Sequence, residues 1–142
     1  MFAGIYEHQL DDKNRLRIPS KFRKELTGEN GDKNYCFFRG KNGCICVMEE
    51  SKLSDMLESL MAEDFTESNK ITRAIFSSVC VAEEDAQGRV VLPVNLRLIA
   101  GIKKDVITLG VGNRLEIWSA DRYVEYMQKD FDYDEELGKL RL

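Results

Sequence analysis

Short segments in which apolar and polar residues alternate recur along the chain, as in strands that bury one face. Clusters of glycine, asparagine and aspartate separate these segments and predict turns, with hairpins around Gly40–Gly43 and Gly110–Asn113. In the second segment, Leu16 and Ile18 are expected to face inward and the two arginines outward. The expected strands are residues 2–9, 15–18, 36–39, 44–48, 79–83, 89–92, 106–109 and 114–118.

Apolar residues spaced three and four apart predict helices between the strands. The clearest helix runs from residue 51 to about 64, with a polar loop at 29–34 before the first hairpin. Its other face, which includes Glu58 and Glu63, is acidic and most simply a solvated surface. The apolar stripe consists of Leu53, Met56, Leu57, Leu60 and Met61.

A second helix is expected from residue 67 to 77, with Ile71, Ala74 and Ile75 facing inward. A proline at the end of a strand favours the start of a short helix. This arrangement is expected twice in the chain, at Pro19 and at Pro93. The acidic tail after residue 130 is expected to be a final short helix or disordered. The other short helices are expected at 20–26, closing near Gly28, before Gly101, and from Ala120 onward, where Tyr123, Tyr126 and Met127 form a stripe.

One motif occurs twice: an acid, three residues, an arginine, an apolar residue, any residue, an apolar residue and proline. The copies are Asp11–Pro19 and Asp85–Pro93, and the same offset of 74 residues places Arg23 on Arg97. A self-match at a fixed offset indicates two related halves. The expected organisation is a first module at 1–64, a connecting helix at 65–78 and a second module at 79–142.

A structural role explains much of this motif. The aspartate at the entrance of the turn can accept backbone N–H bonds, and the arginine that begins the return strand can bond back across the turn or project outward. Asn14 and Gly88 share a position where a positive φ is natural. The residues assigned to the motif itself are Asp11, Asn14, Pro19, Asp85, Gly88, Arg89 and Pro93.

Charge separates the two copies. Residues 11–24 contain six bases against two acids, a local charge of +4, although the whole chain carries −4. Such bases on a two-stranded ribbon can bind phosphates and reach guanine edges in a major groove, while a charged solvated face explains them about as well. The predicted DNA-binding residues are Lys13, Arg15, Arg17, Lys21, Arg23 and Lys24, four of which become Gln87, Val91, Asn95 and Leu98 in the second copy.

Composition narrows the class of protein. With 43% hydrophobic and 32% charged residues among 142, the chain is typical of a globular protein, and no apolar run approaches the roughly 20 residues that span a bilayer. We therefore expect a cytoplasmic protein without a membrane partner. A pI near 5.2 argues against indiscriminate coating of nucleic acid.

The cysteines are expected to be reduced core residues. Cys36, Cys44, Cys46 and Cys80 include no C-x-x-C pair, and His8, itself expected to be structural, is the sole histidine. No metal site, cofactor, small-molecule substrate or catalytic residue is therefore predicted, and an enzyme is the weakest interpretation because no nucleophile has a partner base.

The motifs resemble those of the MraZ family. The resemblance covers essentially the whole chain and includes Met1-Phe2-x-Gly4, Leu10-Asp11-x-Lys13-x-Arg15-Leu16-x-Ile18-Pro19, Asp85-x-x-Gly88-Arg89-Val90-x-Leu92-Pro93 and the segment Leu115–Trp118. The family usually has glycine at the position of Asn14, and asparagine also tolerates that turn.

This resemblance implies an α+β fold with two tandem, pseudo-symmetric AbrB/SpoVT-like β-barrel modules. It also implies a ring-shaped homo-oligomer of eight or more subunits. MraZ-like proteins are nucleoid-associated bacterial transcriptional regulators that bind short G-rich direct repeats in double-stranded DNA, upstream of the division and cell wall gene cluster that includes their own gene. Carried over by position, Arg15 is the best match to a DNA-contacting residue.

Two other interpretations remain. An AbrB-like antitoxin would neutralise a toxin with its second half, although such proteins generally have one module and a disordered tail. A structural ring or protein-interaction scaffold would carry its bases only as solvated surface.

Overall fold

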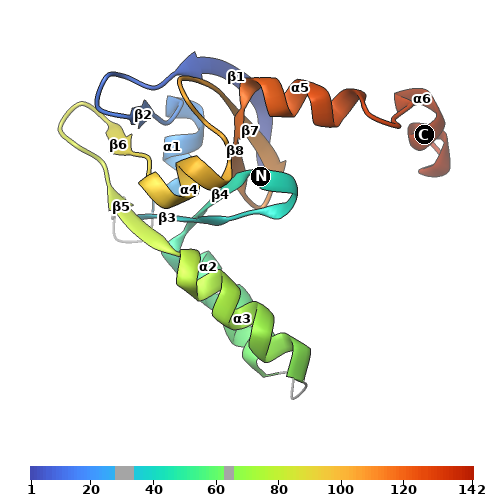
Figure 1. Ribbon diagram of the computed structural model, residues 1–142. Coiled ribbons are helices and arrows are strands. Elements are labelled where there is room, and N and C mark those ends of the chain that lie inside the picture. The colour runs from blue at the N-terminus through green and yellow to red at the C-terminus, as the bar shows by residue number, and fades with distance from the viewer. Residues whose placement is uncertain (28–33, 63–65) are drawn as a thin grey trace.

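Two hairpins form the centre of the main sheet (Figure 1). In this computed structural model, β3 (Asn34–Arg39) pairs antiparallel with β4 (Ile45–Glu49), and β7 (Asp105–Gly112) pairs with β8 (Leu115–Ser119). Both predicted hairpins are confirmed. The structure describes residues 1–27, 34–62 and 66–142, so the predicted loop before Asn34, the helix end near Gly28 and the acidic residue Glu63 lie outside the described residues.

Each outer strand of this sheet comes from the other half of the chain. β1 (Phe2–Gln9) pairs with β7, and β5 (Cys80–Glu83) pairs with β3. Within the described residues, six strands therefore run in the order β1-β7-β8-β4-β3-β5. The order is pseudo-symmetric, because β1, β3 and β4 of the first half occupy positions equivalent to those of β5, β7 and β8 of the second half. At the centre Cys46 lies opposite Glu116, so a pseudo-twofold axis passes between these two residues.

The two copies of the repeated motif meet in a separate ribbon. β2 (Arg15–Arg17) pairs antiparallel with β6 (Arg89–Val91), and Leu16 lies opposite Val90. The return strand therefore pairs with its repeat counterpart and not with β1, the strand that precedes it. Leu16, Ile18 and Val90 are buried beneath the ribbon, which confirms the inward direction predicted for Leu16 and Ile18.

Helices cover both faces of the central strands. One buried cluster lies under the β2–β6 ribbon, α1 and α4, and it combines residues such as Leu16 and Leu92 from the two halves. The other lies between the sheet and the α2, α3 and α5 segments, where Trp118 packs against Tyr123. The helices are α1 (Ser20–Leu26), the 3-10 turn η1 (Lys41–Gly43), α2 (Glu50–Met61), α3 (Thr66–Ser78), α4 (Val94–Ile99), α5 (Ala120–Gln128) and α6 (Tyr133–Lys139).

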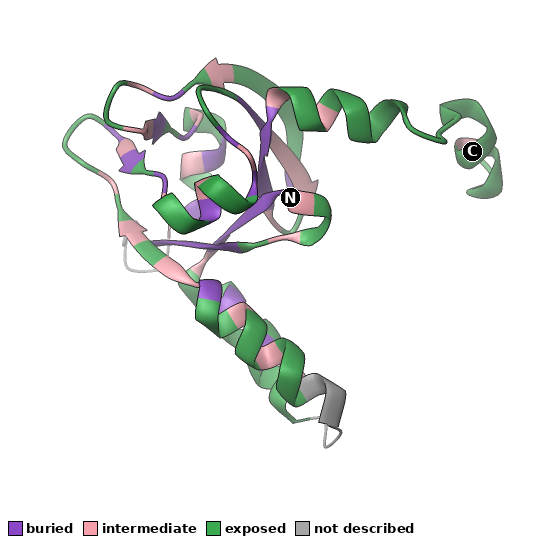
Figure 2. Ribbon diagram, in the orientation of Figure 1, coloured by how far each residue is buried: buried purple, intermediate pink, exposed green. Residues whose placement is uncertain are grey.

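The α2–α3 hairpin projects from the body and is largely exposed beyond its base (Figure 2). Leu53 and Leu57 are buried, but Met56 and Met61 in the same predicted stripe are exposed. The inward direction predicted for Ile71 and Ala74 is wrong, because α3 packs on α2 and β3 and leaves most of its length in solvent. The tail forms α6. Throughout residues 1–27, 34–62 and 66–142, every helix is too short or too polar to cross a lipid bilayer.

Candidate nucleic-acid interface

The aspartate of each repeated motif closes a turn. Asp11 Oδ1 accepts the backbone N–H groups of Lys13 and Arg15 at 3.0 and 2.8 Å, and Asp11 N–H donates to Arg15 O at 3.0 Å. Around Asp85 the two side-chain bonds are each 2.9 Å long. The carboxylates thus satisfy turn N–H groups that would otherwise need water.

The conformation of the turn and the start of the helix are also repeated. Asn14 has a φ of 57° and Gly88 a φ of 80°, so both occupy the left-handed region at corresponding positions. Pro19 and Pro93 lie immediately before α1 and α4 as their N-cap residues. The fixed φ of proline favours this transition from strand to helix.

The two arginines of the motif form a four-residue ion-pair cluster with the two aspartates. Within each copy, Arg15 Nε lies 2.7 Å from Asp11 Oδ2, and Arg89 Nε lies 2.9 Å from Asp85 Oδ2. Across the copies, Arg15 Nη1 is 3.9 Å from Asp85 and Arg89 Nη1 is 3.7 Å from Asp11. The side chains of Arg15 and Arg89 are 24% and 25% exposed, so the two arginines have nearly equivalent surroundings.

This cluster keeps both aspartates ionised. Burial acts to raise the pKa of Asp11, but the backbone N–H and guanidinium of Arg15 and the N–H of Lys13 together hold that pKa below its usual value. The backbone N–H of Arg89 is the largest influence on Asp85, and the pKa of this carboxyl is likewise lowered. Each aspartate therefore stabilises the folded state above its ordinary pKa near 3.9, and this stabilisation is lost as the pH falls below that value.

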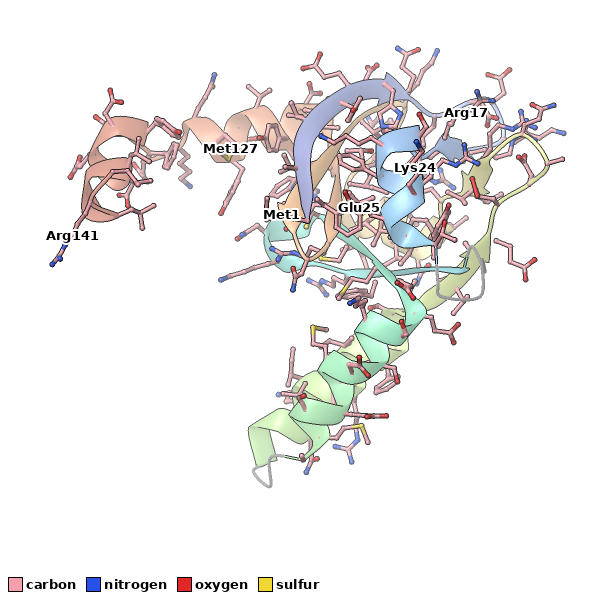
Figure 3. The ribbon with its side chains drawn as sticks, turned by 180° about the vertical axis from the view of Figure 1, so that it is seen from behind. Met1, Arg17, Lys24, Glu25, Met127 and Arg141 are labelled. Atoms are coloured by element: carbon pink, nitrogen blue, oxygen red, sulfur yellow. The ribbon has the colours of Figure 1, made fainter. Side chains whose placement is uncertain are left out.

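Four of the six predicted DNA-binding residues have exposed cationic groups. Lys13 lies in the first turn, Arg17 on β2, and Lys21 and Lys24 on α1, and all four are exposed. None forms an ion pair with a residue in the described part of the chain. Figure 3 shows Arg17 and Lys24 projecting from β2 and α1 on the same side of the molecule. Lys21 Nζ donates one hydrogen bond to Ala3 O at 3.3 Å and keeps two further N–H donors, so all four groups are available to a polyanion.

Arg23 lies differently. Its Nε is 2.5 Å from Glu84 Oε1, and the Arg23 and Glu84 side chains are 29% and 5% exposed. The hydrogen bond to Glu84 raises the pKa of Arg23. The pKa of the neighbouring Tyr35 is raised to about 12, mainly because the phenol is buried and also because it bonds to the Glu84 carboxylate. Arg23 thus links α1 of the first half to Glu84, the residue that follows β5 in the second half.

The second copy presents apolar side chains where the first presents polar and basic ones. Val91 and Leu98 correspond to Arg17 and Lys24, and they are 56% and 72% exposed. Exposed apolar patches of this kind mark interaction surfaces. Aligning the two copies of the repeat already shows that these basic residues are replaced by apolar ones. Only the fold shows that the apolar side chains are exposed. The patch consists of Val91, Val94, Leu98 and Ile99.

The remaining candidate residues are packed in the sheet. His8 Nε2 lies 2.7 Å from Thr108 Oγ1 across the β1–β7 pair, and burial lowers the pKa of His8. All four cysteines are free thiols. The predicted core position is confirmed for Cys36, Cys44 and Cys46, which are buried, but it is wrong for Cys80, which is only half-buried on β5.

Comparison with known proteins gives a consistent result. Residues 1–74 and 75–139 both match the family model described as "MraZ protein, putative antitoxin-like". Proteins named "Transcriptional regulator MraZ" are similar over nearly the whole chain. That of Clostridium botulinum (strain Eklund 17B / Type B) is 38% identical over 94% of this chain and 92% of its own length. That of Clostridium acetobutylicum is 41% identical over 93% and 91%, and that of Syntrophomonas wolfei is 38% identical over 98% and 95%.

Proposed function

This chain belongs to the MraZ family of transcriptional regulators, and we propose that it binds short G-rich direct repeats in double-stranded DNA upstream of the bacterial division and cell wall gene cluster. The observation that carries this proposal is the unequal surface of the two copies. The first copy presents Lys13, Arg17, Lys21 and Lys24 as exposed cations, whereas the second presents an apolar patch. In this proposal the protein acts at the nucleoid.

In the proposed mechanism, the role of each basic residue depends on whether a carboxylate of the protein binds it. The four exposed cations neutralise phosphates and release counterions, which makes binding dependent on salt. Arg15 is held by Asp11 and Asp85 at the end of the ribbon, so its guanidinium reaches a base edge with little loss of side-chain entropy. Arg23 positions α1 through Glu84, and its contact with DNA is at the margin. The AbrB/SpoVT-like barrel modules at 1–64 and 79–142, joined at 65–78, are the proposed units that present these surfaces.

A competition experiment tests the proposal. Binding to a labelled duplex with several G-rich direct repeats is challenged with unlabelled duplexes of the same length and composition, either intact or with the repeats scrambled. We expect the intact duplex to compete at least 10-fold better, since each lost base contact costs roughly 1–3 kcal/mol. Equal competition would reject sequence-specific regulation and favour a general DNA binder. A scaffold would bind neither duplex, and an antitoxin would require a toxin partner.

The proposed assembly is a ring-shaped homo-oligomer. The patch formed by Val91, Val94, Leu98 and Ile99 is the candidate subunit contact, because burying it against a second copy removes apolar surface from water. Each subunit of such a ring would present one basic face to successive DNA repeats. Weak single contacts would then combine through effective concentration, which allows a chain of net charge −4 to bind DNA tightly.

Replacing Leu98 with lysine, the residue of the first copy, is expected to dissociate this assembly. The substitution places a charge in the proposed contact, and mass measurement by light scattering should show a shift to smaller species at the same protein concentration. Gln87→Lys adds the same charge on an exposed turn and should leave the mass unchanged. A wild-type mass retained by Leu98→Lys would place the subunit contact elsewhere.

A further inference from the structure

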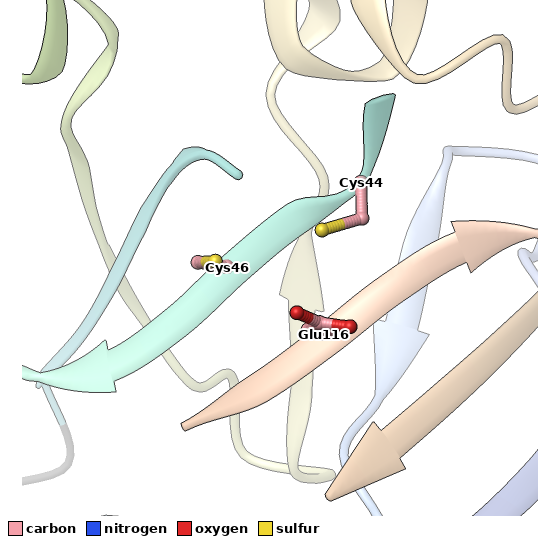
Figure 4. A group of neighbouring side chains, drawn as sticks. All are labelled: Cys44, Cys46 and Glu116. Carbon is pink, nitrogen blue, oxygen red and sulfur yellow. The ribbon is translucent and has the colours of Figure 1, made fainter. Parts of the chain in front are cut away.

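Two thiols and a carboxylate gather on the buried face of the sheet that packs against α5. Cys44 precedes β4, Cys46 lies on β4 and Glu116 lies on β8 (Figure 4). Their two sulfur atoms and one carboxylate oxygen all lie within 4.8 Å of one another. All three residues are buried, at 1%, 4% and 7% exposure. The cluster lies on the pseudo-twofold axis, and it contains none of the exposed bases of the first copy.

The local sequence builds this cluster. Cys44 is extended, so residues 44 and 46 place their side chains on the same face of the strand. Cys46 is the cross-strand partner of Glu116, which adds the carboxylate on that face. The turn before Cys44 closes directly over the sulfur atoms. A Cβ atom on Gly40 would lie 2.6 and 2.7 Å from the Cys44 and Cys46 Sγ atoms, so only glycine leaves room for both.

Neighbouring donors fix the direction of the carboxylate. Trp118 Nε1 donates to Glu116 Oε1 at 3.1 Å, and Arg114 Nη2 donates to Glu116 Oε2 at 3.0 Å. Arg114 Nε also donates to Glu116 Oε2, at 3.3 Å, so Oε2 accepts two hydrogen bonds and Oε1 keeps the lone pair that these bonds do not use. Hydrogen bonds from outside a metal site to its carboxylate ligands are typical of protein sites, where they orient the ligand. The Arg114 side chain is 34% exposed, so a partly exposed residue borders the buried cluster.

We propose that Cys44, Cys46 and Glu116 bind one divalent thiophilic cation of the zinc class. Zinc–sulfur bonds of about 2.3 Å hold two thiolates roughly 4 Å apart, which matches the compact cluster. On binding, the two thiols release their protons. The two thiolates and the carboxylate then balance the charges of the cation and of the Arg114 guanidinium. Three protein ligands leave the fourth tetrahedral position for water.

A disulfide is the weaker alternative for the same sulfurs. Residues two apart in an extended strand have Cα atoms roughly 6.6 Å apart, close to the upper limit of about 6.8 Å for a disulfide. A cation bridges the two sulfurs without that contraction. It would also join β4 of the first half to β8 of the second half, so binding should stabilise the folded chain.

Cobalt(II) titration of the reduced, metal-free full chain tests this site. We expect thiolate-to-cobalt charge-transfer absorption that saturates at one ion per chain and is displaced by zinc. Cys44→Ser and Cys46→Ser should each abolish this absorption. Cys80→Ser should retain it, because Cys80 lies on β5 outside the cluster. Absence of the charge-transfer absorption from the wild-type chain, or its persistence in Cys46→Ser, would overturn the proposal.

A second measurement covers serine variants that fail to fold. Native mass spectrometry of the wild-type chain with zinc should show the mass of one zinc ion less two protons for each subunit, and the melting temperature should rise with zinc and return on chelation. A wild-type chain that gains no zinc mass and no thermal shift would also overturn the proposal. DNA binding is not a readout in either experiment, so the result is independent of the proposed function.

Discussion

Replacing Arg15 with alanine is expected to weaken binding to repeat-containing DNA by roughly 5- to 150-fold for each subunit that contacts a base, and by more in an assembly that multiplies the loss. This range corresponds to about 1–3 kcal/mol for one bidentate contact to guanine. Arg89→Ala is expected to change DNA affinity little, because the second copy lacks the exposed bases around it. Fluorescence anisotropy with the repeat duplex measures both.

The pseudo-symmetry makes Arg89 a matched control. Arg15 and Arg89 bind equivalent aspartates, contact the opposite copy at 3.9 and 3.7 Å, and have nearly equal exposure. Both alanine variants should therefore lose similar folding stability, which urea denaturation measures. The difference in DNA affinity then reports contact with DNA and not damage to the ribbon. Equal loss of affinity in the two folded variants would contradict the proposed division between the copies.

Arg23→Ala is expected to destabilise the fold by about 3 kcal/mol. Removing one partner of a buried ion pair typically costs about 3–5 kcal/mol because the other charge stays in the interior. The lower end applies here, since the Glu84 side chain is 5% exposed but that of Arg23 is 29% exposed and partly solvated. Chemical denaturation should show an earlier midpoint with an unchanged slope.

The repeat supplies the controls for this prediction. In the repeat, Arg97 corresponds to Arg23 and Leu10 corresponds to Glu84. Arg97 therefore has no carboxylate at the position where Arg23 has Glu84. Arg97→Ala should therefore cost less stability than Arg23→Ala. Adding Glu84→Leu to Arg23→Ala should recover part of the loss, because it removes the buried charge. A variant Arg23→Ala that keeps full stability and loses DNA affinity would instead show that Arg23 acts mainly at the DNA.

Much of the local structure follows from the sequence. Alternation of apolar and polar residues identified the strands, and the turn residues at Gly40–Gly43 and Gly110–Asn113 identified both hairpins, because these signals act over a few neighbouring residues. The pairing of β1 with β7 joins residues about 100 apart in the chain, for example His8 with Val106. The periodicity of apolar residues predicts which face of a strand is buried but not which strand it pairs with. The exchange of strands between the halves could therefore not be predicted from the sequence and is seen only in the tertiary structure.

The candidate interface was only partly visible before the fold was known. The repeat identified six bases, yet exposure and ion pairing divide them, with Arg15 and Arg23 held by carboxylates of the other half. Helix patterning likewise placed Ile71 inward, whereas the projecting α2–α3 hairpin leaves it in solvent. An apolar stripe on a helix predicts which residues can be buried. Which of them are buried depends on the surface that the rest of the fold places against the helix.

By itself, the sequence determined the strands, helices, turns and repeated motif of this protein, because each depends on local backbone preference and on the spacing of apolar residues. Only the tertiary structure decided which charges are free. It places Asp85 beside Arg15 and Glu84 beside Arg23, and it brings Glu116 to Cys44 and Cys46. The physical reason is that electrostatic and coordination contacts depend on distances of a few ångströms, which strand pairing between distant segments sets.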